Sequence, residues 1–194
     1  PVHDRVYASS GGLSIIDAER LEVVRFIVHC GYGFVECSPD GRRVYVLDDD
    51  AVLAIDTQGD SVAARIRVGT EPRFGAFSSD GSRFVCGGEA ALRLQVIDCA
   101  TEKLAASYAF GCDVSGVVVA GELGLAFVLD EYGPSVFAVD IVTREPAWDR
   151  DVTPFVEDAF ADEDRGKLYS VADDGKVYVL DARTGVTLCT LDIG

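Results

Sequence analysis

Residues 38–81 read SPDGRRVYVLDDDAVLAIDTQGDSVAARIRVGTEPRFGAFSSDG and contain one complete structural unit with the start of the next. Short apolar runs alternate in this stretch with Gly, Asp and Pro, which is the pattern of β-strands joined by tight turns. The turn SPDGRR at 38–43 returns as SSDGSR at 78–83. A unit that recurs along the chain indicates a repeat protein.

Five aspartates mark the period of the repeat along the whole chain. They follow apolar runs and are spaced 39, 42, 42 and 41 residues apart: Asp17, Asp56, Asp98, Asp140 and Asp181. We expect each to be structural, because an Asp in a turn accepts hydrogen bonds from backbone N–H groups two residues on. No helical periodicity interrupts the pattern.

Four short strands in a unit of about 40 residues are typical of a β-propeller blade. One blade cannot bury both of its faces, so neighbouring blades must cover them. The sequence therefore predicts an all-β fold, a single propeller domain with four-stranded antiparallel blades. The expected blades cover approximately residues 1–33, 34–73, 74–115, 116–157 and 158–194.

The inner strand of the blade is predicted four times, whereas the second, third and fourth strands are predicted five times. Three interpretations fit this count. The favoured one is that the chain is part of a longer ring of about seven blades. The others are a five-bladed ring with one incomplete blade, and a ring completed by a second copy or a partner chain.

The quoted stretch resembles the YVTN-type propeller repeat. The resemblance rests on a Pro-Asp-Gly turn, a VYV strand, an Ile-Asp-Thr turn and a V-G-x-x-P link, and it is close in 38–81 and loose in 112–166. It implies a propeller similar to surface-layer and periplasmic binding proteins and to the heavy subunits of quinoprotein amine dehydrogenases. The repeat pattern carries no catalytic motif.

The net charge of −16 argues against binding to nucleic acid or to anionic lipid, because both would be repelled. No apolar run approaches the ~18 residues that a membrane helix needs. We therefore expect no nucleic-acid partner and no membrane insertion. The expected partner is a protein, or the remaining blades of the same propeller.

The candidate site is the edge of the propeller formed by the turns between second and third strands and by the links between blades; we call it the acidic edge. Carboxylates there could coordinate Ca²⁺ or bind an amine or a basic partner. Turn preference alone also explains Asp at such positions. The acidic edge comprises Asp48, Asp49, Asp50, Glu71, Glu89, Asp113, Asp130, Glu131, Glu157, Asp158, Asp173 and Asp174.

Trp148 is the only tryptophan and lies in the irregular link WDRDVTPFVEDAF, residues 148–160. Two interpretations remain open: an exposed aromatic side chain that binds a partner, or a side chain that covers the edge of a blade. The second is favoured.

Two cysteines, Cys30 and Cys112, occupy equivalent links between blades and are predicted at the mouth of the channel. Two thiols there could bind a soft metal or react with an electrophile, although unreactive thiols are favoured. Cys86 is expected opposite Gln95, which excludes a disulfide with Cys99. Cys37 aligns with Phe77, so we expect it in the core. Free cysteines suggest the cytoplasm, whereas the resemblance suggests an extracytoplasmic location.

The functional prediction is a non-catalytic propeller scaffold that binds a protein or ligand. No predicted residue is catalytic and no cofactor is expected, apart from the Ca²⁺ option. The first alternative is a propeller subunit of a quinoprotein amine dehydrogenase-like redox complex. The second is a cation-dependent enzyme with an acidic channel mouth.

Overall fold

A computed structural model describes residues 4–28, 34–69, 71–88, 93–110, 114–130, 132–152 and 155–194. Within these ranges the chain forms 19 strands and no helix. The described residues therefore include no helix of the length and hydropathy that crossing a bilayer requires. Glycines, aspartates and prolines separate the strands, as the repeat pattern predicts.

The strands form five antiparallel sheets, one with three strands and four with four, and each sheet uses strands that are consecutive in the chain. In chain order the sheets contain β1 (Arg5–Ser9), β2 (Gly12–Asp17) and β3 (Glu22–Val28); β4 (Val35–Cys37), β5 (Arg43–Leu47), β6 (Ala51–Asp56) and β7 (Ser61–Arg67); β8 (Phe74–Phe77), β9 (Arg83–Gly88), β10 (Arg93–Asp98) and β11 (Lys103–Ala109); β12 (Val114–Ala120), β13 (Leu125–Asp130), β14 (Ser135–Asp140) and β15 (Glu145–Asp151); and β16 (Val156–Asp162), β17 (Lys167–Ala172), β18 (Lys176–Asp181) and β19 (Thr187–Asp192).

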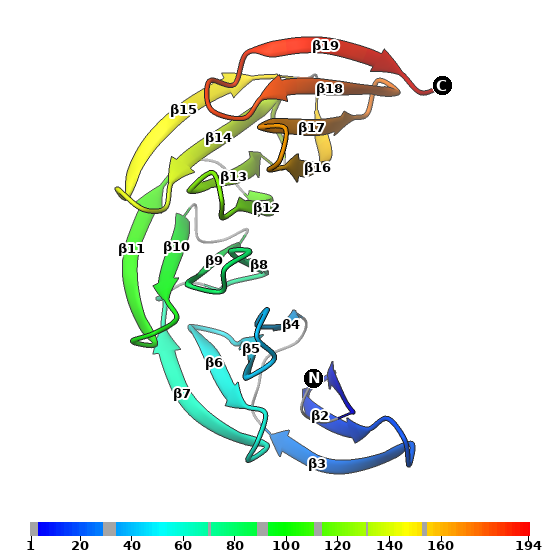
Figure 1. Ribbon diagram of the computed structural model, residues 1–194, viewed down its shortest axis with the longest axis vertical. Helices are drawn as coiled ribbons and strands as arrows, with labels where there is room; N and C mark the ends of the chain where they lie inside the picture. The colour runs from blue at the N-terminus through cyan, green and yellow to red at the C-terminus, as the bar shows by residue number, and fades with distance from the viewer. Residues whose placement is uncertain are drawn as a thin grey trace.

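The five sheets stand side by side in an open arc, as the blades of a propeller do (Figure 1). Strands β4, β8, β12 and β16 line the concave side, and β3, β7, β11, β15 and β19 form the convex side (Figure 1). The predicted β-propeller fold is confirmed. The first sheet lacks an inner strand, which agrees with the four inner strands that the sequence predicts.

The hydrophobic core is divided into four clusters, one between each pair of neighbouring sheets. Strand β5 shows the arrangement: Val44 and Val46 belong to the cluster with the first sheet, and Tyr45 and Leu47 to the cluster with the third. Alternate residues of a strand point to opposite faces, so a strand with both faces covered is apolar at every position.

The second and third sheets approach closely around three aromatic rings. The centroids of Tyr45, Phe77 and Phe84 lie 4.8–4.9 Å from one another, in tilted and edge-on arrangements that aromatic pairs favour. A Cβ atom at Gly75 would lie 2.4 Å from Cζ of Phe84. Glycine at this position therefore leaves the space that the Phe84 ring fills.

The repeated aspartates organise the turns between third and fourth strands. Oδ1 of Asp56 accepts hydrogen bonds from the backbone N–H groups of Gln58 and Gly59, at 2.9 and 2.8 Å. The equivalent bonds form at Asp17, Asp98, Asp140 and Asp181. The expected structural role of the five aspartates is confirmed.

The cysteine predictions have two outcomes. Cys86 pairs with Gln95 in the β9–β10 register, as predicted, and both Cys86 and Cys99 are free thiols. The prediction for Cys37 is wrong, because its side chain is exposed. The thiol is smaller than the Phe77 ring with which it aligns, and the first sheet has no inner strand to cover it.

Candidate functional site

Asp48 and Asp50 lie in the turn between β5 and β6, where one arginine of β7 binds both. The Arg65 guanidinium donates to Oδ2 of Asp48 and, at 2.6 Å, to Oδ1 of Asp50. The Asp48 side chain is only 8% exposed. An arginine within the same sheet therefore offsets one of the two negative charges of this pair, whereas Asp49 between them is exposed.

Glu71 and the pair Asp173–Asp174 lie on other blades of the acidic edge. Glu71 is exposed, and its carboxylate is 3.5 Å from the Arg73 guanidinium. Asp174 accepts hydrogen bonds from Nζ of Lys176 at 2.8 Å and from the Tyr178 hydroxyl at 2.9 Å. The bond from Lys176 is the largest cause that lowers the pKa of Asp174.

Glu157 and Asp158 lie near the start of β16, the inner strand of the fifth sheet. The pairing of β16 with β17 shifts between Val156 and Asp158, which leaves Glu157 as the extra residue of a β-bulge. Both acidic residues are exposed. A bulge re-aims the side chains at the end of a strand, so it directs this pair toward solvent beside the concave side.

Asp130 and Trp148 are the remaining described candidates. Asp130 is partly buried, and its Oδ1 accepts a hydrogen bond from the Tyr132 backbone N–H at 3.2 Å. Trp148 is 8% exposed and donates from Nε1 to the Ala182 carbonyl of the fifth sheet at 3.0 Å. Its ring centroid is 5.7 Å from that of Phe127. Trp148 thus lies between the fourth and fifth sheets, and it is not a freely exposed aromatic residue.

Five predicted residues lie outside the described residues: Glu89, Asp113, Glu131, Cys30 and Cys112. The hypothesis of thiols at a channel mouth therefore stays a prediction.

The described carboxylates of the acidic edge do not converge on one point. They are spread over the second, third, fourth and fifth sheets. Among the residues in the described ranges, no three His, Cys, Asp or Glu side chains are grouped so that they could hold a metal ion together. The arrangement suits a broad negative surface that attracts a basic partner.

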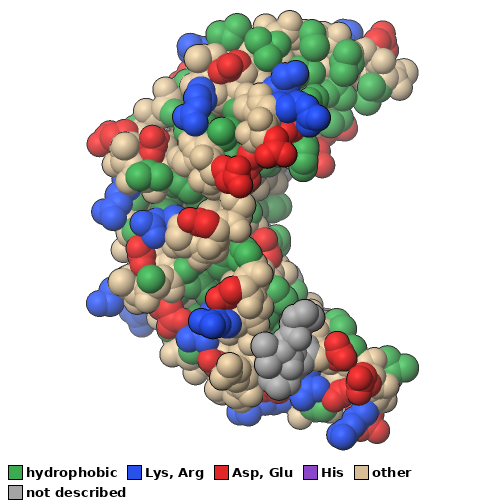
Figure 2. Space-filling model, in the orientation of Figure 1, with side chains coloured by type: hydrophobic (Ala, Val, Ile, Leu, Met, Phe, Trp, Pro, Cys, Tyr) green, Lys and Arg blue, Asp and Glu red, His purple; other side chains and the backbone are tan. Residues whose placement is uncertain are grey.

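The hydrogen-bond and ion-pair donors that bind these carboxylates were not predicted from the sequence. Arg65, Lys176 and Tyr178 each lie on a strand and reach back to an acidic turn. A signal existed for Arg65: in the strand SVAARIR it alternates with the buried Ile66, which places it on the exposed face of β7. Figure 2 shows acidic and basic side chains intermixed on the face that it presents.

The comparisons with known proteins support the fold. No protein-family model and no curated protein match the sequence. Among 1555 matching chains of solved structures is the dihydro-heme d1 dehydrogenase NirN in complex with DHE, with a TM-score of 0.76 and 20% identity. The match covers 98% of this chain and 44% of that one, so the chain spans less than half of the neighbour's length. Likeness at this identity concerns the propeller fold alone.

Proposed function

We propose that the chain is a non-catalytic propeller scaffold that binds a basic protein or ligand through its acidic edge. The observation that carries the proposal is the distribution of exposed carboxylates over a rigid set of packed sheets. Asp49, Glu157, Asp158 and Asp173 are exposed on three different connections of that edge. A scaffold with functional loops at one edge is a common use of such folds.

Electrostatics favours a basic partner in particular. The chain has a net charge of −16, which steers positively charged molecules toward it. The exposed carboxylates that form no ion pair with arginine lie singly or beside one other carboxylate, at separate places along the acidic edge. Such a surface gives long-range attraction and selectivity of partner more than it gives tight binding at one point.

The test compares two triple variants with equal changes of net charge. The first neutralises the acidic edge by Glu157→Gln, Asp158→Asn and Asp173→Asn. The second neutralises three exposed carboxylates of the opposite edge by Glu19→Gln, Glu145→Gln and Asp164→Asn. The probe is a fluorescein-labelled oligoarginine peptide, and its anisotropy is measured at low and at physiological salt.

We expect the first triple variant to weaken binding by about tenfold and the second to leave it within about twofold of the parent. Equal weakening by both variants would mean that net charge alone attracts the peptide, and would overturn the proposal for this edge. A higher salt concentration should weaken binding to the parent chain, because exposed charges are screened.

A redox role is the second candidate, since the structural neighbour is a dehydrogenase by its name. In that case the chain would be the propeller subunit of a redox complex, as in the quinoprotein amine dehydrogenase alternative. Purification of the native complex from its source tests this candidate. A small second chain with a cofactor absorption band, present in a fixed ratio, would support the redox role over the scaffold.

The assignment to YVTN-type repeats belongs to the proposal as well, and it rests on the turns and strands of residues 38–81. The remaining candidate is a cation-dependent enzyme. If Ca²⁺ binds the native acidic edge, it should raise the melting temperature by mass action, and Glu157→Gln with Asp158→Asn should abolish the rise.

A further inference from the structure

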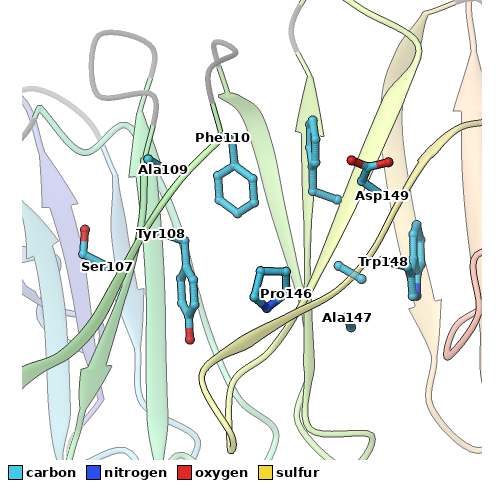
Figure 3. Close-up of a pocket in the computed structure, with 10 residues that line it drawn as sticks. Ser107, Tyr108, Ala109, Phe110, Pro146, Ala147, Trp148 and Asp149 are labelled. Atoms are coloured by element: carbon cyan, nitrogen blue, oxygen red, sulfur yellow. The ribbon is translucent and has the colours of Figure 1, made fainter.

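An aromatic pocket opens on the convex side of the arc, between the outer strands β11 and β15 of the third and fourth sheets. Its volume is about 530 Å³. No carboxylate of the acidic edge lines the pocket, and the proposed function does not use it. Its lining includes the rings of Tyr108, Phe110 and Phe137, together with Pro146, Trp148 and Asp149 (Figure 3), while the Trp148 indole itself faces the fifth sheet.

The repeat provides internal references for this pocket, because the sheet registers identify equivalent positions. Tyr108 of β11 pairs with Leu94 of β10, and Ile66 of β7 pairs with Val52 of β6, so Tyr108 and Ile66 occupy equivalent positions. Phe137 pairs with Asp149 as Gln95 pairs with Ser107 in the third sheet. At the equivalent place between the second and third sheets, Ile66 therefore replaces Tyr108, and Gln95 with Ser107 replaces the Phe137–Asp149 pair.

The comparison shows what is specific to the pocket. Aromatic rings replace an aliphatic and an amide side chain, and a carboxylate replaces a hydroxyl. In the second sheet the position of Asp149 is occupied by Arg65, which pairs with Leu53. Arg65 binds two carboxylates, whereas the Asp149 carboxylate has no hydrogen-bond or ion-pair partner among the described residues.

The walls of the pocket are held in place by contacts outside it. The Phe110 and Phe137 rings pack with centroids 5.1 Å apart at an angle of 48°. The Trp148 indole is fixed by its hydrogen bond to Ala182 and by contact with Phe127. In Figure 3, Pro146 lies between Tyr108 and Trp148 in the view. A ligand would therefore meet rings that are already ordered, which lowers the entropic cost of binding.

We propose that this pocket binds an organic cation that has an aromatic or alkyl body and an ammonium group. The apolar body would be buried against Tyr108, Phe110 and Pro146, and the ammonium would lie beside the Asp149 carboxylate. Aromatic faces attract cations, and the exposed Asp149 carboxylate at the rim adds a charge-assisted hydrogen bond. Two cations lie near the Tyr108 side of the pocket: Arg93, whose Nη1 is 3.4 Å from the Ser107 hydroxyl, and Arg144, which interacts electrostatically with Tyr108. Among the described residues neither forms an ion pair with Asp149, so the Asp149 side is open to a ligand cation.

The test measures binding by isothermal titration calorimetry, because the Trp148 indole faces the fifth sheet and its fluorescence would not report on the pocket directly. The parent chain is titrated with phenethylammonium and with its neutral isostere 2-phenylethanol. We expect saturable binding, with the cation bound about tenfold more tightly than the alcohol. Equal affinities for the two probes would overturn the proposal.

Three variants assign the effect to the carboxylate. Asp149→Asn should lose the preference for the cation, and Asp149→Ser, which introduces the residue of the third sheet, should do the same. Glu19→Gln, an exposed carboxylate in the turn of the first sheet, lies outside the pocket and serves as the matched control with unchanged affinity. If the Asp149 variants keep the tenfold preference, the proposal fails. Circular dichroism of each variant verifies the fold.

The ammonium group can belong to a free small molecule or to a lysine side chain of a partner. N-acetyl-lysine amide is the third probe, and it carries the same charge on an alkyl chain. Tighter binding of phenethylammonium indicates a free aromatic cation, and tighter binding of the lysine derivative indicates a partner side chain. Failure of both cations to displace each other would show that they do not share the pocket, and would overturn the assignment.

Discussion

The second and fifth sheets share one strand pattern but differ in their surroundings. In the second sheet, β5 and β6 are buried from Val44 to Leu47 and from Ala51 to Ile55, because sheets cover both faces. In the fifth sheet every residue of β19 is exposed, and hydrophobic side chains gather over β18 and β19 at one end of the arc (Figure 2). The same repeat therefore contributes very differently to stability, depending on how many neighbours a sheet has.

The largest difference should appear when one phenylalanine is removed from each region. Phe84 is fully buried against Tyr45 and Phe77, and Phe160 of β16 is 65% exposed. Phe84→Ala should lower the free energy of unfolding by about 3–5 kcal/mol. Phe160→Ala should change it by less than about 0.5 kcal/mol. Denaturant unfolding monitored by circular dichroism measures both changes. Similar losses of unfolding free energy would contradict the difference between the two sheets.

Removing a turn aspartate should also lower the free energy of unfolding more in the second sheet than in the fifth, but by a smaller amount than removing a phenylalanine. Arg43 donates to Asp56 at 2.6 Å and to Glu102 of the third sheet at 2.8 Å, so this turn also links two sheets. Asp181 in the fifth sheet has bonds to its own turn. Asp56→Ala should cost about 2 kcal/mol and Asp181→Ala about 1 kcal/mol. Equal costs would show that the link through Arg43 contributes nothing.

The pH dependence separates turn bonds from packing. Backbone N–H groups, with Gly59 the largest cause, lower the pKa of Asp56. A lowered folded-state pKa gives stability that is present above the unfolded pKa of about 3.9 and lost as pH falls through the folded pKa. The difference in stability between the parent and Asp56→Asn should therefore shrink on acidification. The difference for Phe84→Ala should stay constant, because no ionisable group of that cluster titrates in this window. Acid titration at fixed urea measures both differences.

The smallest effect on stability is expected at the exposed face of β19. Leu188 and Leu191 are 53% and 49% exposed, so the double change to Ser should alter the free energy of unfolding by less than about 0.5 kcal/mol. It should reduce self-association, since a contiguous apolar patch favours contact between molecules. Sedimentation velocity measures association. Leu180→Ser, at a fully buried position of β18, is the control that should destabilise the fold.

Features that depend on residues within one repeat were predicted correctly from the sequence. The spacing of Asp17, Asp56 and Asp98 located the turns, and strand alternation placed Cys86 opposite Gln95. These features depend on residues that are close in the chain or aligned by a hairpin. Nothing in the sequence placed Trp148 against Ala182, 34 residues away. That contact depends on how two sheets pack, which a period cannot show.

The sequence predicted which residue types form the candidate site, but not how their side chains are arranged. Acidic residues at turns identified the acidic edge. The ion pairs of Arg65 with Asp48 and Asp50 could be recognised only from the side-chain positions. The exposure of Cys37 depended on the absence of an inner strand in the first sheet, although its aligned partner Phe77 is buried. The aromatic pocket also escaped sequence reading, since its walls come from β11, β14 and β15.

The pairing of every strand only with its neighbours in the chain has a consequence for how the molecule opens. Within the described ranges, the main contacts of each sheet are with the one or two sheets beside it. Opening can therefore begin at either end of the arc and advance sheet by sheet, as in a one-dimensional array with nearest-neighbour coupling. Backbone amides should exchange with deuterium fastest in the first and fifth sheets and slowest in β9 and β10, a gradient that records the order in which sheets detach.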